Sequence, residues 1–129
     1  NNFVKTMIRL MSEREELSVI NDQIGSPTYA RDLARALVKI VESNTWTPGI
    51  YHYSNEGEIS WFEFAEAIRE IAGLSCEIHP IPTSSYPTPA KRPKYSLLNK
   101  SKIKETYAVL VPHWRASLEE MINALKQTN

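Results

Sequence analysis

The sequence predicts an α/β fold of about three short strands and four to five helices, and two observations support this class. Short β-branched runs alternate with amphipathic stripes of about a dozen residues, the pattern of parallel strands joined by helices. The 129 residues, 42% of them hydrophobic, suit one compact domain that needs neither a metal ion nor a disulfide to hold its core.

The first third of the chain predicts two helices and one strand. An amphipathic stripe of apolar residues predicts a helix over about 3–15. A β-branched run predicts a strand over 17–21, and turn-forming residues follow it over 22–28. The next helical stripe extends over 29–43, and Thr28 is available as its N-cap.

The middle of the chain contains a helix with defined ends. A second strand is predicted over 50–54. Ser60 and Glu63 form a capping box, in which the hydroxyl accepts from a free N–H and the carboxylate accepts from the N–H of the cap residue. The helix that follows ends at Gly73, because glycine readily adopts the left-handed conformation. A third strand is predicted over 76–81.

A proline-rich segment separates this helical region from the C-terminus. Five of the eight prolines lie between residues 80 and 93. Proline fixes φ and removes a hydrogen-bond donor, so the segment is predicted to be a stiff extended loop. Long ordered loops are often functional. A short helix over 101–107 and an amphipathic helix over 114–126 complete the predicted fold.

Charge and composition exclude several classes of protein. Fifteen basic residues balance fifteen acidic ones, which argues against general binding to nucleic acid or to an acidic membrane. We find no apolar run long enough to span a membrane and no signal peptide. The single Cys76 fits a reducing compartment, so we expect a cytoplasmic protein. The chain begins at Asn1, inside a predicted helix start, and looks like part of a longer protein.

The residues needed for several kinds of chemistry are missing from the sequence. Four glycines form no glycine-rich turn that could approach the pyrophosphate of a dinucleotide, and no tyrosine is followed four residues later by lysine. The histidines, at positions 52, 79 and 113, are far apart and near no second cysteine, so we expect no metal site. We therefore assign no catalytic residue to this sequence.

One positive feature is a run of cations without any acidic residue between positions 90 and 104. Arg92 stands out because Pro89 and Pro93 stiffen its backbone, and a guanidinium can bind phosphate oxygens through two parallel hydrogen bonds. A solvated basic loop is the alternative interpretation. The six cations are Lys91, Arg92, Lys94, Lys100, Lys102 and Lys104.

Four segments together resemble the C-terminal part of the dTDP-4-dehydrorhamnose reductases, a family of extended short-chain dehydrogenases/reductases. They occur in the same order and cover essentially the whole chain, and the last is the most specific. The segments are Asn1-Asn-Phe-Val-Lys-Thr-Met7, Asn21-Asp-Gln-Ile-Gly-Ser-Pro-Thr28, Gly49-Ile-Tyr-His52 and Tyr86-Pro-Thr-Pro-Ala-Lys-Arg-Pro-Lys-Tyr-Ser96.

The resemblance implies a Rossmann-type fold of which residues 1–129 form the substrate-binding domain. In the family, the N-terminal half carries the glycine-rich cofactor turn and the catalytic Thr/Ser, Tyr and Lys, so a cofactor-binding Rossmann domain is missing from this sequence. The full enzyme would transfer a hydride from NADPH or NADH to the C4 ketone of dTDP-4-dehydro-L-rhamnose. We expect this sequence alone to bind no cofactor and to be inactive.

The resemblance also implies which residues contact the dTDP-sugar. Asn2 and Asn1 match a position at which extended family members place an amide against phosphate or sugar, although a helix N-cap is the alternative for Asn2. Arg92 matches an arginine that such enzymes use on the pyrophosphate. Lys91, the adjacent cation, is included with it.

The remaining substrate-binding candidates lie in two loops. Gln23, Pro27 and Thr28 follow the strand that borders the nucleotide, where Gln23 could bond the base or sugar and Thr28 could equally be a helix cap. Tyr86, like Tyr95, could stack on a ring or pack in the core. The residues assigned to packing are Trp46, Trp61 and Trp114.

Two other classes of function stay open from the sequence. A non-catalytic relative that binds a partner protein, such as the regulatory subunit of methionine adenosyltransferase, would share the fold, and so would a structural α/β domain. We also expect a homodimer, because helix 29–43 and strand 50–54 would expose apolar surface and an unpaired strand edge.

Overall fold

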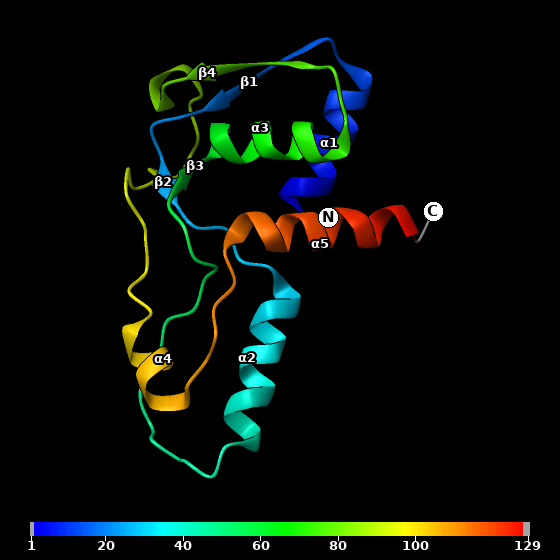
Figure 1. Cartoon of the computed structure of the whole chain (residues 1–129). Coiled ribbons are helices and arrows are strands. Elements are labelled where there is room, and N and C mark those ends of the chain that lie inside the picture. Colours follow the sequence, from blue (N-terminus) through cyan, green and yellow to red (C-terminus); the bar gives the residue numbers. More distant parts are fainter. Residues whose placement is uncertain (1, 128–129) are drawn as a thin grey trace. The chain divides into compact units, whose positions relative to one another are not determined.

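A computed structural model describes residues 2–127, which divide into two compact units (Figure 1). Unit 1 combines residues up to 25 with residues 58–96, and unit 2 combines residues 26–57 with the C-terminal region from residue 97. The chain therefore passes between the units three times. Each unit is described by itself.

Unit 1 is a two-layer α/β arrangement. Strands β1 (Glu16–Ile20) and β4 (Glu77–Ile81) pair in parallel, with Leu17 opposite Ile78. Helices α1 (Phe3–Glu13) and α3 (Trp61–Ala72) pack against each other beneath this pair (Figure 1). The predicted strands 17–21 and 76–81 are thus confirmed within one residue at each end, as is their parallel pairing. The buried core residues are Met11, Leu17, Val19, Ala65, Cys76 and Ile78.

Local sequence signals define both ends of α3. The Oγ of Ser60 accepts from Glu63 N at 3.1 Å, and the Oε2 of Glu63 accepts from Ser60 N at 2.7 Å. Gly73 ends the helix with φ +73°, a left-handed conformation that glycine adopts without strain. The predicted capping box and C-cap are both confirmed.

Two short segments of unit 1 extend the strand content beyond the prediction. β2 (Ile24–Gly25) pairs antiparallel with β3 (Ile59–Ser60). The sequence predicts only a loop at β2, because two residues are too few to show alternation. After β4, one 3₁₀ turn, η1 (Thr83–Ser85), precedes irregular backbone with several bends. The predicted loop is therefore confirmed apart from this turn, while its extended, stiff character stays a prediction.

Pro80 removes a hydrogen-bond donor from one edge of the parallel sheet. Glu77 N donates to Glu15 O at 2.8 Å, and Ile81 O accepts from Asn21 N at 3.0 Å. Because backbone groups alternate in direction along a strand, Pro80 lies where an N–H would point away from β1. Its ring removes that donor and blunts the outer edge of β4.

Unit 2 consists of three helices joined by extended chain. They are α2 (Ala30–Glu42), α4 (Ser101–Tyr107) and α5 (Trp114–Gln127), close to the predicted ranges 29–43, 101–107 and 114–126. Its buried apolar cluster comprises Ala36, Ile103, Tyr107 and Val109.

The predicted strand 50–54 is wrong. These residues lie in unit 2 without strand structure, and their backbone forms no backbone hydrogen bond with any other part of the chain that the structure describes. Tyr51 and Tyr53 pack against the apolar cluster of the unit. The β-branched and aromatic alternation therefore reflects side-chain packing, while a strand also requires a neighbouring backbone.

The predicted N-cap of α2 is also wrong. Tyr29, and not Thr28, is the cap residue, and its own side chain makes no capping bond. Its backbone N–H donates at 2.7 Å to the Oδ1 of Asn55, which is 1% exposed. A side chain distant in sequence thus satisfies the start of the helix, so the local cap is not needed.

Some apolar residues of unit 2 are exposed. Leu37, Val38 and Val41 on α2 and Ile50 all face solvent. Trp46 is 82% exposed, so its assignment to packing is wrong, whereas Trp114 is buried as predicted. The expected homodimer stays a prediction. Among the described helices, none is both long and apolar enough to cross a membrane.

Candidate functional site

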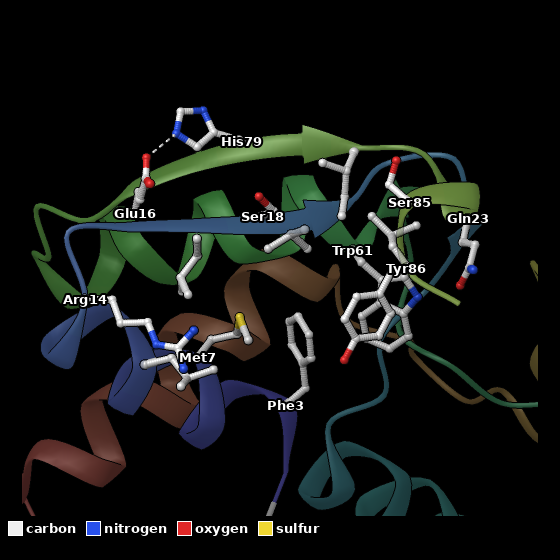
Figure 2. Close-up of a pocket in the computed structure, with 15 residues that line it drawn as sticks. Phe3, Met7, Arg14, Glu16, Ser18, Gln23, Trp61, His79, Ser85 and Tyr86 are labelled. Carbon is white, nitrogen blue, oxygen red and sulfur yellow. Dashed lines mark hydrogen bonds and ion pairs between the residues drawn. The ribbon is translucent and has the colours of Figure 1, made fainter. Parts of the chain in front are cut away.

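Unit 1 contains a cavity of about 850 Å³ beside β1. Phe3, Met7 and Leu10 of α1 form an apolar wall, and Trp61 stands close to Phe3 with ring centroids 4.8 Å apart (Figure 2). Trp61 is 44% exposed, so it lines the cavity and is not a core residue as assigned. Three aromatic and sulfur-containing side chains thus offer a surface on which a flat ring can pack.

Polar residues gather at the carboxyl end of β1. Gln23, Ser85 and Tyr86 lie there, while Arg14 lies toward the amino end (Figure 2). The structure therefore places Gln23 and Tyr86, two predicted binding residues 63 positions apart in number, at one end of one cavity. In open α/β sheets, ligands bind at the carboxyl ends of parallel strands.

Two further lining residues of the cavity, Glu16 and His79, form a polar contact with each other. His79 Nε2 lies 3.3 Å from Glu16 Oε2 on the side of the strands away from the helices (Figure 2). Across the described part of the chain, no group of three or more His, Cys, Asp or Glu side chains is placed to hold a metal ion. This contact is therefore an exposed pair, which contributes little stability.

The cations of the predicted cluster divide between the two units. Lys91, Arg92 and Lys94 belong to unit 1 and are exposed. Within residues 2–127, the side chains of Lys91 and Arg92 have no hydrogen-bond or ion-pair partner. Cations without protein partners are available to an external anion.

The other three cations are occupied within unit 2. Lys100 is buried, with Nζ 3.2 Å from both Ser54 Oγ and the carbonyl oxygen of Asn55. Lys104 forms an ion pair with Glu56. The side chain of Lys102 donates to a backbone carbonyl at 3.0 Å. The interpretation of the six cations as one free cluster is therefore wrong, and anion binding by the cations of unit 1 stays a prediction.

Asn2 begins α1 as its N-cap. Its Oδ1 accepts from Lys5 N at 3.0 Å, so the alternative interpretation as a helix cap is confirmed. A contact between Asn2 and a substrate stays a prediction. Asn1 lies outside the described residues.

Pro27 and Thr28 belong to unit 2, where they precede α2. The carbonyl of Pro27 accepts from Asn55 N at 3.2 Å, and Thr28 is exposed. The structure thus gives Pro27 a structural contact. Their assignment to a binding site stays a prediction.

The two tyrosines of the proline-rich region are not core residues. Tyr86 is 60% exposed and Tyr95 is 57% exposed, which contradicts the alternative of core packing. The hydroxyl of Tyr95 donates to Glu58 Oε2 at 3.3 Å. Partial desolvation is the main cause that raises the pKa of Tyr95, and the negative charge of Glu58 raises it further. Tyr86 remains available at the cavity.

The sequence interpretation missed a pair of residues, one after β1 and one at the start of the proline-rich segment. Asp22 Oδ1 accepts from the backbone N of Thr83 at 2.9 Å and also from its hydroxyl. The hydroxyl bond is the largest influence that lowers the pKa of Asp22 below its ordinary value. Asp22 is adjacent to the predicted Gln23, but no local pattern identifies Thr83 as its partner.

Unit 1 is thus an α/β unit with a partly aromatic cavity, and the beginning of a loop that carries exposed cations lines this cavity. Its class is that of the extended short-chain dehydrogenases/reductases, as the comparisons show. The chain belongs to the RmlD substrate binding domain family, whose model matches residues 1–127.

Curated relatives agree with this family. The chain is 45% identical over 122 residues to the spore coat polysaccharide biosynthesis protein SpsK of Bacillus subtilis, covering 95% of the chain and 42% of the relative. It is 39% identical over 137 aligned residues to dTDP-4-dehydrorhamnose reductase of Escherichia coli, covering 99% and 46%. The chain thus spans less than half the length of these relatives.

Solved structures give the same result. The dTDP-4-dehydrorhamnose reductase of Bacillus anthracis in complex with NADP has a TM-score of 0.87 and 43% identity, covering 96% of this chain and 43% of that one. The ortholog from Clostridium acetobutylicum has a TM-score of 0.90 and 39% identity, covering 98% and 44%. A UDP-glucuronic acid 4-epimerase from Bacillus cereus, 18% identical with a TM-score of 0.76, supports the fold alone.

The resemblance identified in the sequence is therefore confirmed, together with the predicted α/β class and its Rossmann-type relatives. The proteins named above are reductases, a polysaccharide biosynthesis protein and an epimerase, and they give no support to the regulatory alternative.

Proposed function

We propose that this chain is the dTDP-sugar-binding part of a reductase that converts dTDP-4-dehydro-L-rhamnose to dTDP-L-rhamnose. The observation that carries the proposal is the pair of exposed, unpartnered cations, Lys91 and Arg92, on a proline-braced loop whose beginning lines the cavity. A nucleoside diphosphate sugar requires such a combination, because its diphosphate needs cations and its rings need flat or apolar surface.

Each candidate has a role in this proposal. Arg92 binds the diphosphate through two parallel hydrogen bonds, and Lys91 adds a second positive charge. Gln23 bonds the base or sugar, and Tyr86 packs on a ring at the carboxyl end of β1. Roles for Asn1, Asn2, Pro27 and Thr28 near the sugar nucleotide belong to the same proposal.

The cofactor of the full enzyme, NADPH or NADH, would supply the hydride. The residues present here do not fit its pyrophosphate, because side chains already fill the space beside three of the glycines. An added Cβ at Gly25 would meet Ser96 Oγ at 2.8 Å, and one at Gly49 would meet Lys102 Nζ at 2.9 Å. The space beside Gly57 is filled by the side chain of Trp114. Gly73 serves as a helix cap.

The isolated chain is proposed to bind the sugar nucleotide without reducing it. Hydride transfer requires a donor and an acid held together against the ketone. The sequence has no Tyr-x-x-x-Lys, and the cofactor-binding Rossmann domain is proposed to lie in the remainder of a longer protein. Mixing the chain with NADPH and the keto sugar should therefore give no oxidation of NADPH above background.

The binding proposal is tested by calorimetric titration of the chain with dTDP at two salt concentrations. Arg92→Ala should weaken affinity about tenfold, since two charge-assisted hydrogen bonds are lost. The loss should shrink at high salt because exposed charges are screened. Arg9→Ala is the matched control, because Arg9 is an exposed arginine that already pairs with Glu13 at 3.0 Å. Equal affinities of Arg92→Ala and the unmodified chain would remove Arg92 from the site.

A further inference from the structure

The proline-rich segment is held at its beginning by residues that follow β1. We call residues 83–94 the strap. The hydroxyl of Thr83 donates to Asp22 Oδ1 at 2.5 Å, and its backbone N donates to the same oxygen at 2.9 Å. Gln23 Nε2 donates to the Thr83 hydroxyl oxygen at 3.1 Å. One threonine side chain thus joins two neighbouring residues of the loop after β1.

The other end of the strap is held by Ile24, the first residue of β2. Ile24 N donates to the carbonyl oxygen of Lys94 at 2.8 Å, and Ser96 N donates to the carbonyl oxygen of Ile24 at 2.9 Å. Gly25 allows this close approach, because a Cβ there would lie 2.8 Å from Ser96 Oγ. Residues 22–24 therefore fix both ends of the strap.

Between these two ends, the strap has few contacts of its own. Tyr86 N donates to Thr83 O at 3.1 Å, and the hydroxyl of Thr88 donates to Ala90 O at 2.8 Å. Neither bond leaves the strap. In residues 2–127 no hydrogen bond or ion pair joins positions 87–93 to another segment. The position of Arg92 consequently depends on the two held ends and on the stiffness of the prolines.

We propose that Asp22 and Thr83 are positioning residues that hold the strap where Lys91 and Arg92 meet the diphosphate. This inference rests on the function proposed above. Neither residue touches the ligand; each acts through the backbone of the strap. Releasing one end lets the strap sample more conformations, and binding must then order it again at a cost in affinity.

The charge of Asp22 suits this role. Two hydrogen bonds from Thr83 satisfy one carboxylate oxygen, and the positive charge of Lys94 acts in the same direction. All three lower the pKa of Asp22, so the carboxylate is ionised at neutral pH and accepts strong hydrogen bonds. The acid is occupied by the protein and does not oppose the anion as an unpaired charge.

The test uses the 129-residue chain and two readouts. Thr83→Val keeps the shape of the side chain but removes its hydroxyl, and Thr83→Ser restores the hydroxyl. Ser84→Ala is the control in the same 3₁₀ turn, because Ser84 is exposed and bonds to no described residue. Calorimetry measures the Kd of dTDP, and hydrogen exchange without ligand measures protection of the amides of Ser85 and Tyr86, which donate to the carbonyl oxygens of Pro82 and Thr83.

We expect Thr83→Val to weaken affinity roughly fivefold, the value of one or two net hydrogen bonds, and to speed exchange along the strap. Thr83→Ser and Ser84→Ala should stay within about twofold of the unmodified chain. In the Arg92→Ala background, Thr83→Val should cost distinctly less than in the unmodified chain, because most of its effect acts through Arg92 and only the part that acts through Lys91 is left. Should Thr83→Val unfold, Asp22→Ala provides the comparison, because it removes the oxygen that accepts both bonds from Thr83.

The outcomes separate the two claims. Absence of dTDP binding to the unmodified chain contradicts the proposed function and, with it, the positioning role. Binding that survives Thr83→Val unchanged, unchanged exchange of the strap, or additive losses in the double variant each overturn the positioning role alone.

Discussion

The two halves of one cationic run differ in what surrounds them. Lys91 and Arg92 in unit 1 are exposed and pair with no described residue, while Lys100 in unit 2 is buried with its Nζ 3.6 Å from Glu56 Oε2. The same residue types, a few positions apart, are thus exposed without a described partner in one case and paired in the interior of the protein in the other. Pairing, and not the count of charges, distinguishes a binding loop from a structural one.

The interiors of the two units also differ in polarity. Unit 1 has an apolar core between a sheet and two helices. Unit 2 buries a polar centre, in which Asn55 Nδ2 donates to Asp32 Oδ2 at 2.8 Å and to Ser117 Oγ at 2.9 Å. Arg35 closes the network with an ion pair to Asp32 at 3.1 Å. We therefore expect polar substitutions to affect stability in unit 2 and ligand affinity in unit 1.

The largest effect is expected at the centre of the polar network. Asn55→Ala should lower the free energy of unfolding by about 3 kcal/mol, because several buried groups lose their partner at once. Urea unfolding followed by circular dichroism measures the change. Asn123→Ala, at an exposed position of α5, should change it by less than about 0.5 kcal/mol. Equal effects of the two variants would contradict the comparison.

A smaller effect is expected at the ion pairs of Glu56. Glu56→Gln should lower the free energy of unfolding by about 2 kcal/mol, because buried Lys100 loses its carboxylate partner. The partial exposure of Glu56 moderates this loss. Glu120→Gln is the control, since Glu120 pairs with the exposed side chains of Arg31 and Arg35. Its effect on thermal unfolding should be distinctly smaller.

The pH dependence of stability sharpens the same prediction. Lys104 is the main reason that the pKa of Glu56 lies below its ordinary value. A lowered pKa in the folded state stabilises the protein above the unfolded pKa, about 4.3, and this contribution is lost as the pH falls through the folded value. Stability should decline below about pH 4.5, and Glu56→Gln should show a shallower decline. Parallel curves for the two proteins would contradict this assignment.

The smallest effect is expected on the strap. Lys91→Ala should weaken dTDP binding roughly two- to threefold, as expected for one exposed, flexible cation, and should leave thermal stability unchanged. Lys39→Ala is the control for the loss of one positive charge, because Lys39 is an exposed lysine that lies on α2 and not on the strap. Equal weakening by the two variants would show that net charge, and not position, governs binding.

Several elements could be predicted from the sequence because their causes are local. Ser60 and Glu63 lie three residues apart, and their mutual capping is determined by helix geometry alone. Gly73 allows the left-handed conformation at its own position, and each proline fixes φ at its own position. Short β-branched runs predict the two parallel strands, and four segments in order predict the family, the most specific of them being the one that contains Arg92 and Pro93.

Contacts between distant residues could be decided only by the tertiary structure. Residues 50–54 have the composition of a strand but lack a neighbouring backbone, and Asn55 replaces Thr28 at the start of α2. Asp22 and Thr83 are 61 positions apart, and nothing near either residue identifies the other. Periodicity and capping are set within one turn of chain, whereas ladders, buried ion pairs and loop anchors depend on which segments pack together.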